Sequence, residues 1–339
     1  MKPLWITLLR LIETAPTEGN ENLRGTTSHF PKNLYILALV NKIVLAYLSR
    51  VHRVDKSEKL FYYHNRRLNV LMKVLADIVK ALNEHGFRYV VFKTLRPFRE
   101  EVADIDILCL GDEVEYFEIT RAIESRGYRL MECSLHCTTF EDPRYRFVTE
   151  VMIDVYREVC AGPLIYLDKK LLHDHVVVRN IGSARVKVLD PVAEVLVTIG
   201  HSVIKERKVI LADYLSVLHY MSSMTCEQME HLVELIRRAR LVHASRWFFT
   251  LATYIHKTAH GFIPEELGKL INMLGGIINL DVDVLKREPP FPCSKRVLVK
   301  VFTEKLSDPL FRASIVNFAP WLSRGRSMHR IASLLARRL

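Results

Sequence analysis

Two aspartates separated by one residue, Asp104 and Asp106, stand in the otherwise apolar run 103–110. Side chains two apart in a strand point to the same face, so the two carboxylates should project together while their isoleucine neighbours enter a core. A third aspartate, Asp154, lies between β-branched residues in a later run. Three carboxylates on strand faces offer hard oxygen ligands and could hold two divalent cations such as Mg²⁺ or Mn²⁺, which is the usual site for nucleotide-phosphate chemistry.

A basic loop leads into the strand of the paired aspartates. Lys93 and Thr94 end an apolar, β-rich run, and Arg96 and Arg99 follow within a few residues. Cationic side chains at this place would neutralise the phosphates of a nucleoside triphosphate, which we predict as the substrate. For Lys93 the competing interpretation is a solvated lysine at the end of a strand.

These blocks together resemble the polymerase-β-type nucleotidyltransferases. The resemblance is carried by Tyr89-Val-Val-Phe-Lys-Thr94, Asp104-Ile-Asp106 and Ile153-Asp-Val155. It is closest to the minimal, toxin-type and antibiotic-modifying branch, in which a Lys-Gly turn precedes the Asp-x-Asp strand. It covers roughly residues 57–225, where a helical domain with one histidine and one aspartate follows the strands, as His201 and Asp213 do in this chain.

The resemblance implies a division of roles. Asp104 and Asp106 would ligate Mg²⁺, and Asp154 would complete the site or act as a general base. Lys93 and Thr94 would line the phosphate turn. The implied reaction moves a nucleoside monophosphate from ATP or another nucleoside triphosphate to an RNA 3′ end, a protein hydroxyl or a small molecule, and a toxin-like role goes with that branch.

The helical part contributes two further predicted nucleotide-binding residues, His201 and Lys205. His201 lies in an apolar helix and could instead be a hydrogen-bonded core histidine. Asp213 could orient a neighbour or pair with a nearby cation; the candidates are Lys205, Arg207 and Lys208.

One departure from the family pattern motivates an alternative function. The family turn carries glycine, which lets backbone amides approach phosphates, whereas Lys93-Thr94-Leu95 has none. The alternative is a catalytically degenerate nucleotidyltransferase fold that binds RNA or a protein partner.

Other chemistries lack their motifs. The sequence contains neither GxGxxG nor GxxxxGK[ST], and neither HExxH nor GxSxG. Its six cysteines include no CxxC pair, which disfavours zinc at Cys133, His136 and Cys137 and indicates a reducing, cytoplasmic setting. We expect Cys133 and Cys137 to pack in a core along one strand.

Positive charge is concentrated at the C-terminal end. Residues 286–339 hold 12 Lys and Arg against three Asp and Glu, so they carry nine of the eleven net positive charges. This segment is predicted to bind RNA or an acidic protein. A solvated helix face is the other interpretation.

The order of periodic segments predicts an α+β fold. A small mixed β-sheet with helices packed on it should be followed by an α-helical domain. The apolar stretch 34–48 is predicted to lie in one helix over 34–52, and Asn41 and Lys42 make it too polar for a membrane span. The predicted domains are an N-terminal helical extension over 1–56, a nucleotidyltransferase α/β domain over 57–189, a helical domain over 190–285 and a basic helical segment over 286–339.

Overall fold

The computed structural model describes residues 3–13, 31–51, 55–100, 102, 104–145, 149–280 and 282–322. Residues 14–30 lie outside this description, and so does the most basic part of the C-terminal segment, from residue 323 onward.

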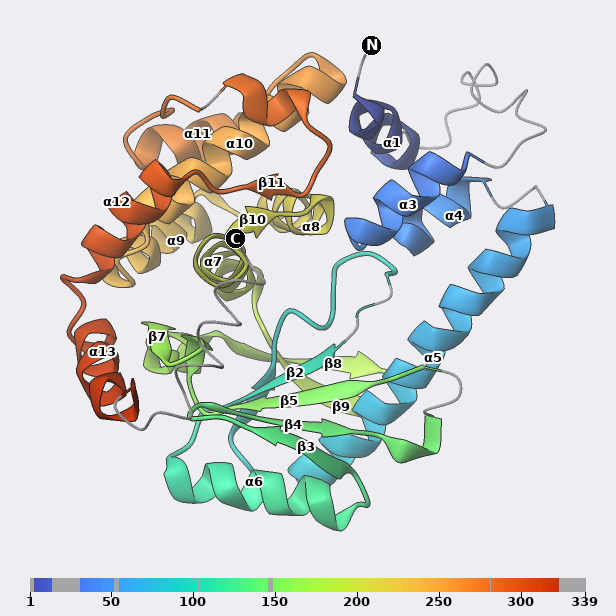
Figure 1. Ribbon diagram of the computed structural model, residues 1–339, viewed down its shortest axis with the longest axis vertical. Helices are drawn as coiled ribbons and strands as arrows, with labels where there is room; N and C mark the ends of the chain where they lie inside the picture. The colour runs from blue at the N-terminus through green and yellow to red at the C-terminus, as the bar shows by residue number, and fades with distance from the viewer. Residues whose placement is uncertain are drawn as a thin grey trace.

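A seven-stranded mixed sheet forms the centre of the molecule (Figure 1). In spatial order its strands are β3 (Arg129–Cys133), β4 (Cys137–Glu141), β5 (Met152–Tyr156), β2 (Asp104–Cys109), β1 (Tyr89–Val91), β9 (Ala184–Leu189) and β8 (Val176–Ile181). Strand β2 is parallel to β5 and antiparallel to β1, and β1 is parallel to β9. Strands β8 and β9 form an antiparallel hairpin that extends the same sheet.

One face of this sheet is covered by α5 (Asp55–Glu84) and α6 (Glu113–Ser125). The buried isoleucines of β2 and β5 pack against these helices, which is the core predicted from the alternating pattern. Asp112 caps α6 by accepting a hydrogen bond from the Glu115 N–H. Because side chains alternate along a strand, the aspartates beside those isoleucines must face the other way.

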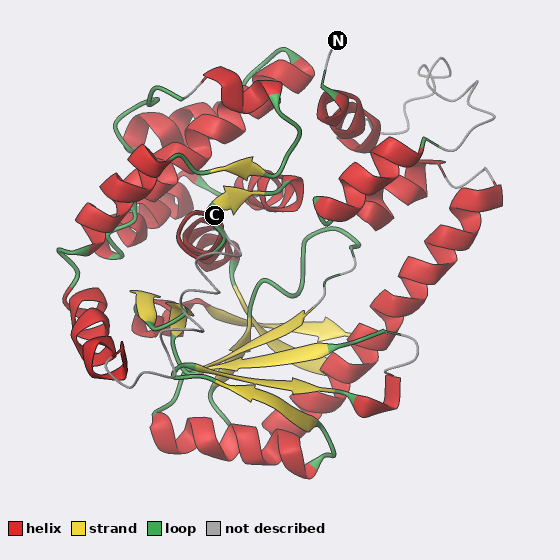
Figure 2. Ribbon diagram, viewed as in Figure 1, coloured by secondary structure: helices red, strands yellow, loops and turns green. Residues whose placement is uncertain are grey.

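Helices cover the opposite side of the sheet (Figure 2). They comprise α1 (Leu4–Glu13), α3 (Lys32–Val40), α4 (Val44–Val51), α7 (Pro191–Gly200), α8 (Leu211–Ser222), α9 (Cys226–Arg238), α10 (Val242–His260), α11 (Glu265–Met273), α12 (Lys295–Lys305) and α13 (Pro309–Leu322). Strands β6 (Val159–Ala161) and β7 (Leu164–Leu167) pair with each other, as do β10 (Lys208–Val209) and β11 (Phe291–Pro292). The α+β class and the run of helices after residue 190 are therefore confirmed.

The helical side shares one hydrophobic core with α1 and β11, which lie far apart in the sequence. Trp5 of α1, Tyr214 of α8 and Phe291 of β11 belong to the same buried cluster, which also includes Leu108 of the sheet. Trp5 and Phe291 meet edge to face, with ring centroids 5.8 Å apart. The N-terminal helices and residues 291–301 thus pack on the helical region.

The single helix predicted over 34–52 is wrong, because the chain breaks between α3 and α4. Asn41 is fully buried at the break, where its Nδ2 donates to the carbonyls of Leu37 (2.9 Å) and Pro289 (3.2 Å). Its Oδ1 accepts from the Leu211 N–H at 3.1 Å. Lys42 then takes a left-handed conformation, with φ of 53°. The buried amide satisfies backbone groups of three segments, and these bonds favour the turn over a continuous helix.

The predicted packing of Cys133 is also wrong. Residues 134–136 form the turn between β3 and β4, so the strand alternation does not continue from Cys133 to Cys137. Cys133 is exposed, contrary to the expectation, whereas His136 in the turn is buried.

Across the described part of the chain, the helices lack the length and apolar character needed to cross a bilayer.

The Asn41 bonds predict a stability effect. Asn41→Ala should lower the free energy of unfolding by about 1–3 kcal/mol, because the Leu211 N–H would remain buried without its acceptor. Urea denaturation followed by circular dichroism measures this change. Asn33→Ala, at an exposed position of α3, is the matched control and should change stability by less than about 0.5 kcal/mol. Equal effects of the two variants would contradict this role.

Candidate active site

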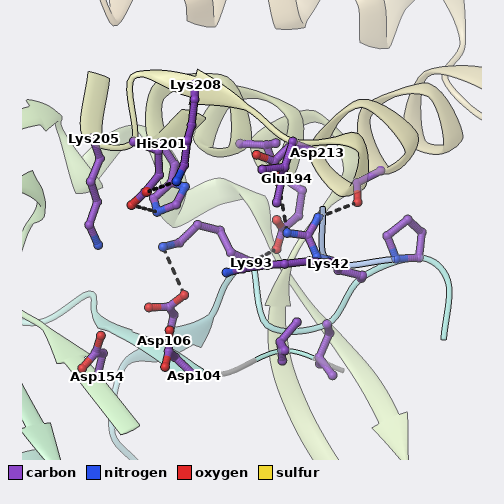
Figure 3. A pocket seen from close by; sticks show the side chains of 18 of the residues that line it. Lys42, Lys93, Asp104, Asp106, Asp154, Glu194, His201, Lys205, Lys208 and Asp213 are labelled. Carbon is purple, nitrogen blue, oxygen red and sulfur yellow. Dashed lines mark hydrogen bonds and ion pairs between the residues drawn. The ribbon is translucent and has the colours of Figure 1, made fainter. Parts of the chain in front are cut away.

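The three aspartates line one cavity of about 200 Å³ between the sheet and the helical region. Strands β2 and β5 pair in parallel register with Asp106 directly opposite Asp154, and Asp104 lies two residues earlier on β2. All three are half-buried, while the residues between and beside them are buried on the other face. Figure 3 shows the carboxylates together on the sheet side of the cavity.

The opposite wall is rich in charged side chains from other parts of the chain. Five cationic residues line the cavity: Lys42, Lys93, Arg96, Lys205 and Lys208. Three acidic residues besides the aspartates also line it: Glu194, Glu206 and Asp213. Six carboxyl groups therefore face five cations, so the cavity as it stands has no excess of positive charge.

Lys93 joins the two walls. Its Nζ lies 3.1 Å from Asp106 Oδ2, and both side chains are largely buried. The ammonium group also lies over the rings of Phe92 and Tyr156, 4.6 Å and 5.4 Å from their centroids. Lys93 thus holds the place beside Asp106 that a bound cation would share.

The backbone at Lys93 is strained. The Thr94 N–H donates to the Phe92 carbonyl at 2.7 Å, which closes a three-residue turn around Lys93. At its centre Lys93 has φ of 59°, a left-handed conformation that normally falls to glycine. This left-handed conformation of a non-glycine residue costs about 1–2 kcal/mol.

Thr94 holds this turn against the neighbouring strand. Its hydroxyl accepts from the Asp106 N–H at 2.8 Å and lies 3.3 Å from the Phe92 carbonyl. The side chain is buried and is not part of the cavity lining. Arg99 also lies outside the lining, where it donates to the side chain of Asn65. Of the predicted nucleotide-binding residues, these two are not brought to the cavity.

Arg96 is fixed at the cavity by two residues of α8. One of its terminal nitrogens donates to Asp213 Oδ1 at 3.0 Å and the other to Ser216 Oγ at 3.1 Å. Asp213 also accepts from Ser202 Oγ at 2.7 Å, so it does orient a neighbour, but its cationic partner is Arg96 and none of the three cations considered from the sequence. The Nε atom of Arg96 is buried without a hydrogen-bond partner among the described residues.

Asp154 is held by two hydroxyl groups. Thr139 Oγ1 donates to Asp154 Oδ1 at 2.6 Å, and the Tyr156 hydroxyl donates to Oδ2 at 3.2 Å. Lys205 Nζ in turn donates to the Tyr156 oxygen at 3.0 Å. This chain of contacts leads from the helical wall to the carboxylate, and it sets the orientation of Asp154.

Protonation in the cavity is perturbed by burial and by like charges. Burial, together with Asp106 and Asp154, raises the pKa of Asp104 to about 6. Burial also raises the pKa of Asp154. The pKa of Glu194 rises to about 7, again through burial. Carboxyl groups gathered in this way resist ionisation until a cation joins them.

His201 belongs to the cavity wall, although it is not fully enclosed. Its side chain is 22 % exposed, and Nε2 lies 3.8 Å from Glu206 Oε1. Burial, followed by the charges of Lys93 and Lys205, lowers the pKa of His201 well below its ordinary value. The imidazole is therefore neutral at pH 7, suited to hydrogen bonding with a bound molecule.

Left-handed residues gather at this site. Lys42 and Lys93 line the cavity, and Arg207, with φ of 56°, stands between two lining residues. Strained backbone of this kind persists where the surrounding structure holds it in place, and it clusters at functional sites.

Lys42, Tyr156, Glu194 and Lys208 are among the lining residues that the sequence interpretation did not propose. Lys42 follows the buried Asn41 in an apolar run, and Glu194 is a lone acid in an apolar helix. Tyr156 is two residues after Asp154 and so shares its face of β5. Those three carried a readable signal, whereas Lys208 depends on the pairing of β10 with β11 and had none.

Comparison with known proteins adds little. No protein-family model matches the sequence, and no curated protein matches it either. Among solved structures, the fold is similar to the crystal structure of an antigenic nucleotidyltransferase-like protein from Paracoccidioides brasiliensis, at 14 % sequence identity and a TM-score of 0.33. The match covers 50 % of this chain and 88 % of that one. Likeness at this level does not decide an activity, so the function has to be inferred from the site itself.

The raised pKa of Asp104 predicts an unusual pH effect in metal-free protein. The folded state binds the Asp104 proton more tightly than the unfolded chain, so this contribution to stability is present below about pH 4 and is lost as pH rises through about 6. Asp104→Asn mimics the protonated form at every pH. With a chelator present, it should match the unsubstituted protein at pH 4 and exceed its free energy of unfolding by about 2–3 kcal/mol at pH 7.

Urea denaturation of both proteins from pH 4 to 7.5 measures this difference. A variant that is less stable by the same amount at every pH would show that Asp104 is an ordinary paired carboxylate.

Proposed function

We propose that this protein is a metal-dependent nucleotidyltransferase that moves a nucleoside monophosphate from a nucleoside triphosphate to an acceptor. The observation that carries the proposal is the in-register placement of Asp106 and Asp154, with Asp104 beside them, opposite a wall of cationic side chains. Carboxylates on one side suit divalent cations, and cations on the other suit phosphates. We also propose that the protein belongs to the toxin-type branch that the sequence resembles.

The residues present fit Mg²⁺. Asp104, Asp106 and Asp154 supply oxygen ligands only, which this hard cation prefers. Their shared cavity raises the pKa of Asp104, which indicates a deficit of positive charge around the three carboxylates. When bound, Mg²⁺ would polarise the phosphate oxygens and stabilise the leaving pyrophosphate.

Charge balance in the cavity supports metal dependence. With six carboxyl groups and five cations, the lining has no excess of positive charge with which to attract a triphosphate of about four negative charges. Two divalent cations would supply that positive charge. The cationic wall alone therefore does not account for nucleotide binding.

The remaining residues have distinct proposed roles. Lys205, Lys208 and Lys42 would contact the phosphates, and Arg96 would donate its unpartnered Nε–H to one of them. Asp154 would orient the acceptor hydroxyl or accept its proton, since two hydroxyl donors fix its position. The neutral His201 would bind the nucleotide by hydrogen bonding.

The acceptor is proposed among three classes: an RNA 3′ end, a protein hydroxyl and a small molecule. Basic residues of the C-terminal segment favour an acidic macromolecule, because Lys295, Arg296 and Lys300 of α12 are exposed.

Activity should depend on the paired aspartates. Asp106→Asn and Asp154→Asn should each lower transfer of labelled nucleotide from ATP, GTP, CTP or UTP by at least about 100-fold in the presence of Mg²⁺. Transfer is measured onto total RNA, cell protein and a small-molecule pool in parallel. Asp174→Asn, at an exposed position outside the cavity lining, is the control and should retain full activity. Transfer that is undiminished in Asp106→Asn would refute the proposal.

A second candidate function rests on the ion pair between Lys93 and Asp106. An internal ammonium can neutralise a carboxylate in place of a metal ion, and a protein that uses it permanently would bind RNA or a protein partner without turnover. This contact is the structural observation that favours the degenerate alternative.

Lys93→Met separates the two functions. In the enzyme, the substitution should lower kcat/KM by about 10–100-fold while Mn²⁺ binding, followed by water proton relaxation, persists in both proteins. In the degenerate protein, Mn²⁺ binding would be absent from the unsubstituted chain and would appear in Lys93→Met. Lys80→Met, at an exposed position of α5, is the control for loss of a lysine.

A further inference from the structure

A second cavity lies on the helical side of the molecule, apart from the aspartate site. Its volume is about 670 Å³, and its lining is mostly apolar, with Leu215, Leu218 and Phe262 among its residues. Within this lining, three side chains that can bind metals lie close together: Glu13, His256 and His260. None of these residues belongs to the cavity of the three aspartates.

The three side chains converge from two elements. His256 and His260 are four residues apart near the end of α10, which places both imidazoles on one face of that helix. Glu13 is the last residue of α1, a helix that packs on α10 (Figure 1). One ligand atom from each residue lies within 4.8 Å of the others. Tetrahedral zinc with bonds of about 2.0–2.1 Å separates its ligands by about 3.4 Å, so small side-chain rotations would complete the arrangement.

The cluster leaves polar atoms unsatisfied. Glu13 Oε1 and His256 Nε2 are buried and have no hydrogen-bond partner among the described residues. His256 is only 8 % exposed, and Glu13 Oε2 contacts His260 Nε2. Unpaired buried acceptors cost about 1–3 kcal/mol each, and a bound cation would satisfy them together.

The surroundings of the histidines suit metal binding. His256 Nδ1 lies 2.8 Å from the Tyr214 hydroxyl, so with its proton on Nδ1 it would donate there and leave the Nε2 lone pair free. Burial lowers the pKa of His256 to about 4, and burial followed by the charge of Arg10 lowers that of His260. Neutral imidazole is the form that coordinates metals. Burial also raises the pKa of Glu13 to about 7, as expected for a carboxylate that lacks a cation.

We propose that Glu13, His256 and His260 bind one Zn²⁺ ion, with the fourth coordination position open to the second cavity. Two imidazole nitrogens and one carboxylate oxygen are a common three-residue zinc set, and the fourth position of such a site holds water or an exchangeable ligand. Mg²⁺ would not compete, because it prefers oxygen ligands in octahedral geometry. The proposal is independent of nucleotide transfer, since the two cavities share no lining residue.

Zinc titration of the full chain tests the proposal. The protein is first stripped with a chelator, and Zn²⁺ is then titrated against a chromophoric competitor in excess Mg²⁺, which occupies oxygen-only sites. We expect one equivalent to bind, and Glu13→Gln and His260→Gln should each weaken binding at least about tenfold. His219→Gln is the matched control, because His219 lines the same cavity outside the three-residue cluster, and it should bind as the unsubstituted chain does.

Two further measurements keep the test decisive. Co²⁺ should give the intense visible absorption of four-coordinate cobalt in the unsubstituted protein and lose it in Glu13→Gln. Metal-free Glu13→Gln should unfold at a Tm no lower than that of the metal-free unsubstituted chain, so lost binding would not reflect misfolding. No zinc binding would overturn the proposal. So would binding that is unchanged in both variants, for example at the His175–His231 pair, whose Nε2 atoms lie 3.2 Å apart.

Discussion

The parallel pairing of β2 with β5 sets Asp106 directly against Asp154, with Asp104 two residues away on the same face. Like charges placed opposite each other on neighbouring strands repel, and partial burial strengthens that repulsion. The sheet can keep this register because the alternate residues of both strands are buried isoleucines and valines, packed under α5 and α6. Hydrophobic burial on one face thus holds an electrostatically unfavourable cluster on the other, and much of the remaining site consists of charges that compensate it.

The compensating cations come from segments far apart in the chain. Lys93 enters from a left-handed turn after β1, Lys205 from the π-helical turn after α7, and Lys42 from the break between α3 and α4. Each of these lysines stands in an irregular piece of backbone, a turn or a π-helical segment, rather than in a regular α-helix or strand. The Thr94 hydroxyl bonds to the Asp106 N–H, and the Asn41 side chain bonds to three backbone groups. Loss of the Thr94 hydroxyl would displace Lys93 from the carboxylates of the cavity, and loss of the Asn41 amide would displace Lys42.

The N-terminal helices have two structural roles in this arrangement. The turn after α3 brings Lys42 to the aspartate cavity, while the end of α1 brings Glu13 to His256 and His260. The first grouping consists of oxygen ligands and ammonium groups, and the second of imidazole nitrogens and one carboxylate. Their donor sets would favour different metals, so the Mg²⁺ site and the Zn²⁺ site that we propose differ in their chemistry.

The sequence by itself determined the features of the fold that follow from hydrophobic periodicity, namely the buried face of each strand and the presence of helices. Alternation in 103–110 and around Asp154 predicted which face each aspartate takes, and helical spacing predicted the run of helices after residue 190. Hydrophobic pattern could do this because burial is decided residue by residue along a strand or helix. The hydrophobic pattern gave a wrong prediction at Asn41, where a buried side-chain amide bonds to backbone groups and ends the helix. It also gave a wrong prediction at Cys133, because a turn interrupts the alternation there.

Only the tertiary structure decided which charged groups meet. The pairing of Arg96 with Asp213, the exclusion of Thr94 and Arg99 from the cavity, and the arrival of Lys42 and Lys208 depend on contacts between residues distant in the chain. The same holds for Glu13, which reaches histidines more than 240 residues away. Charge interactions act through space and carry no period along the sequence, so their partners are set by the packing of whole elements.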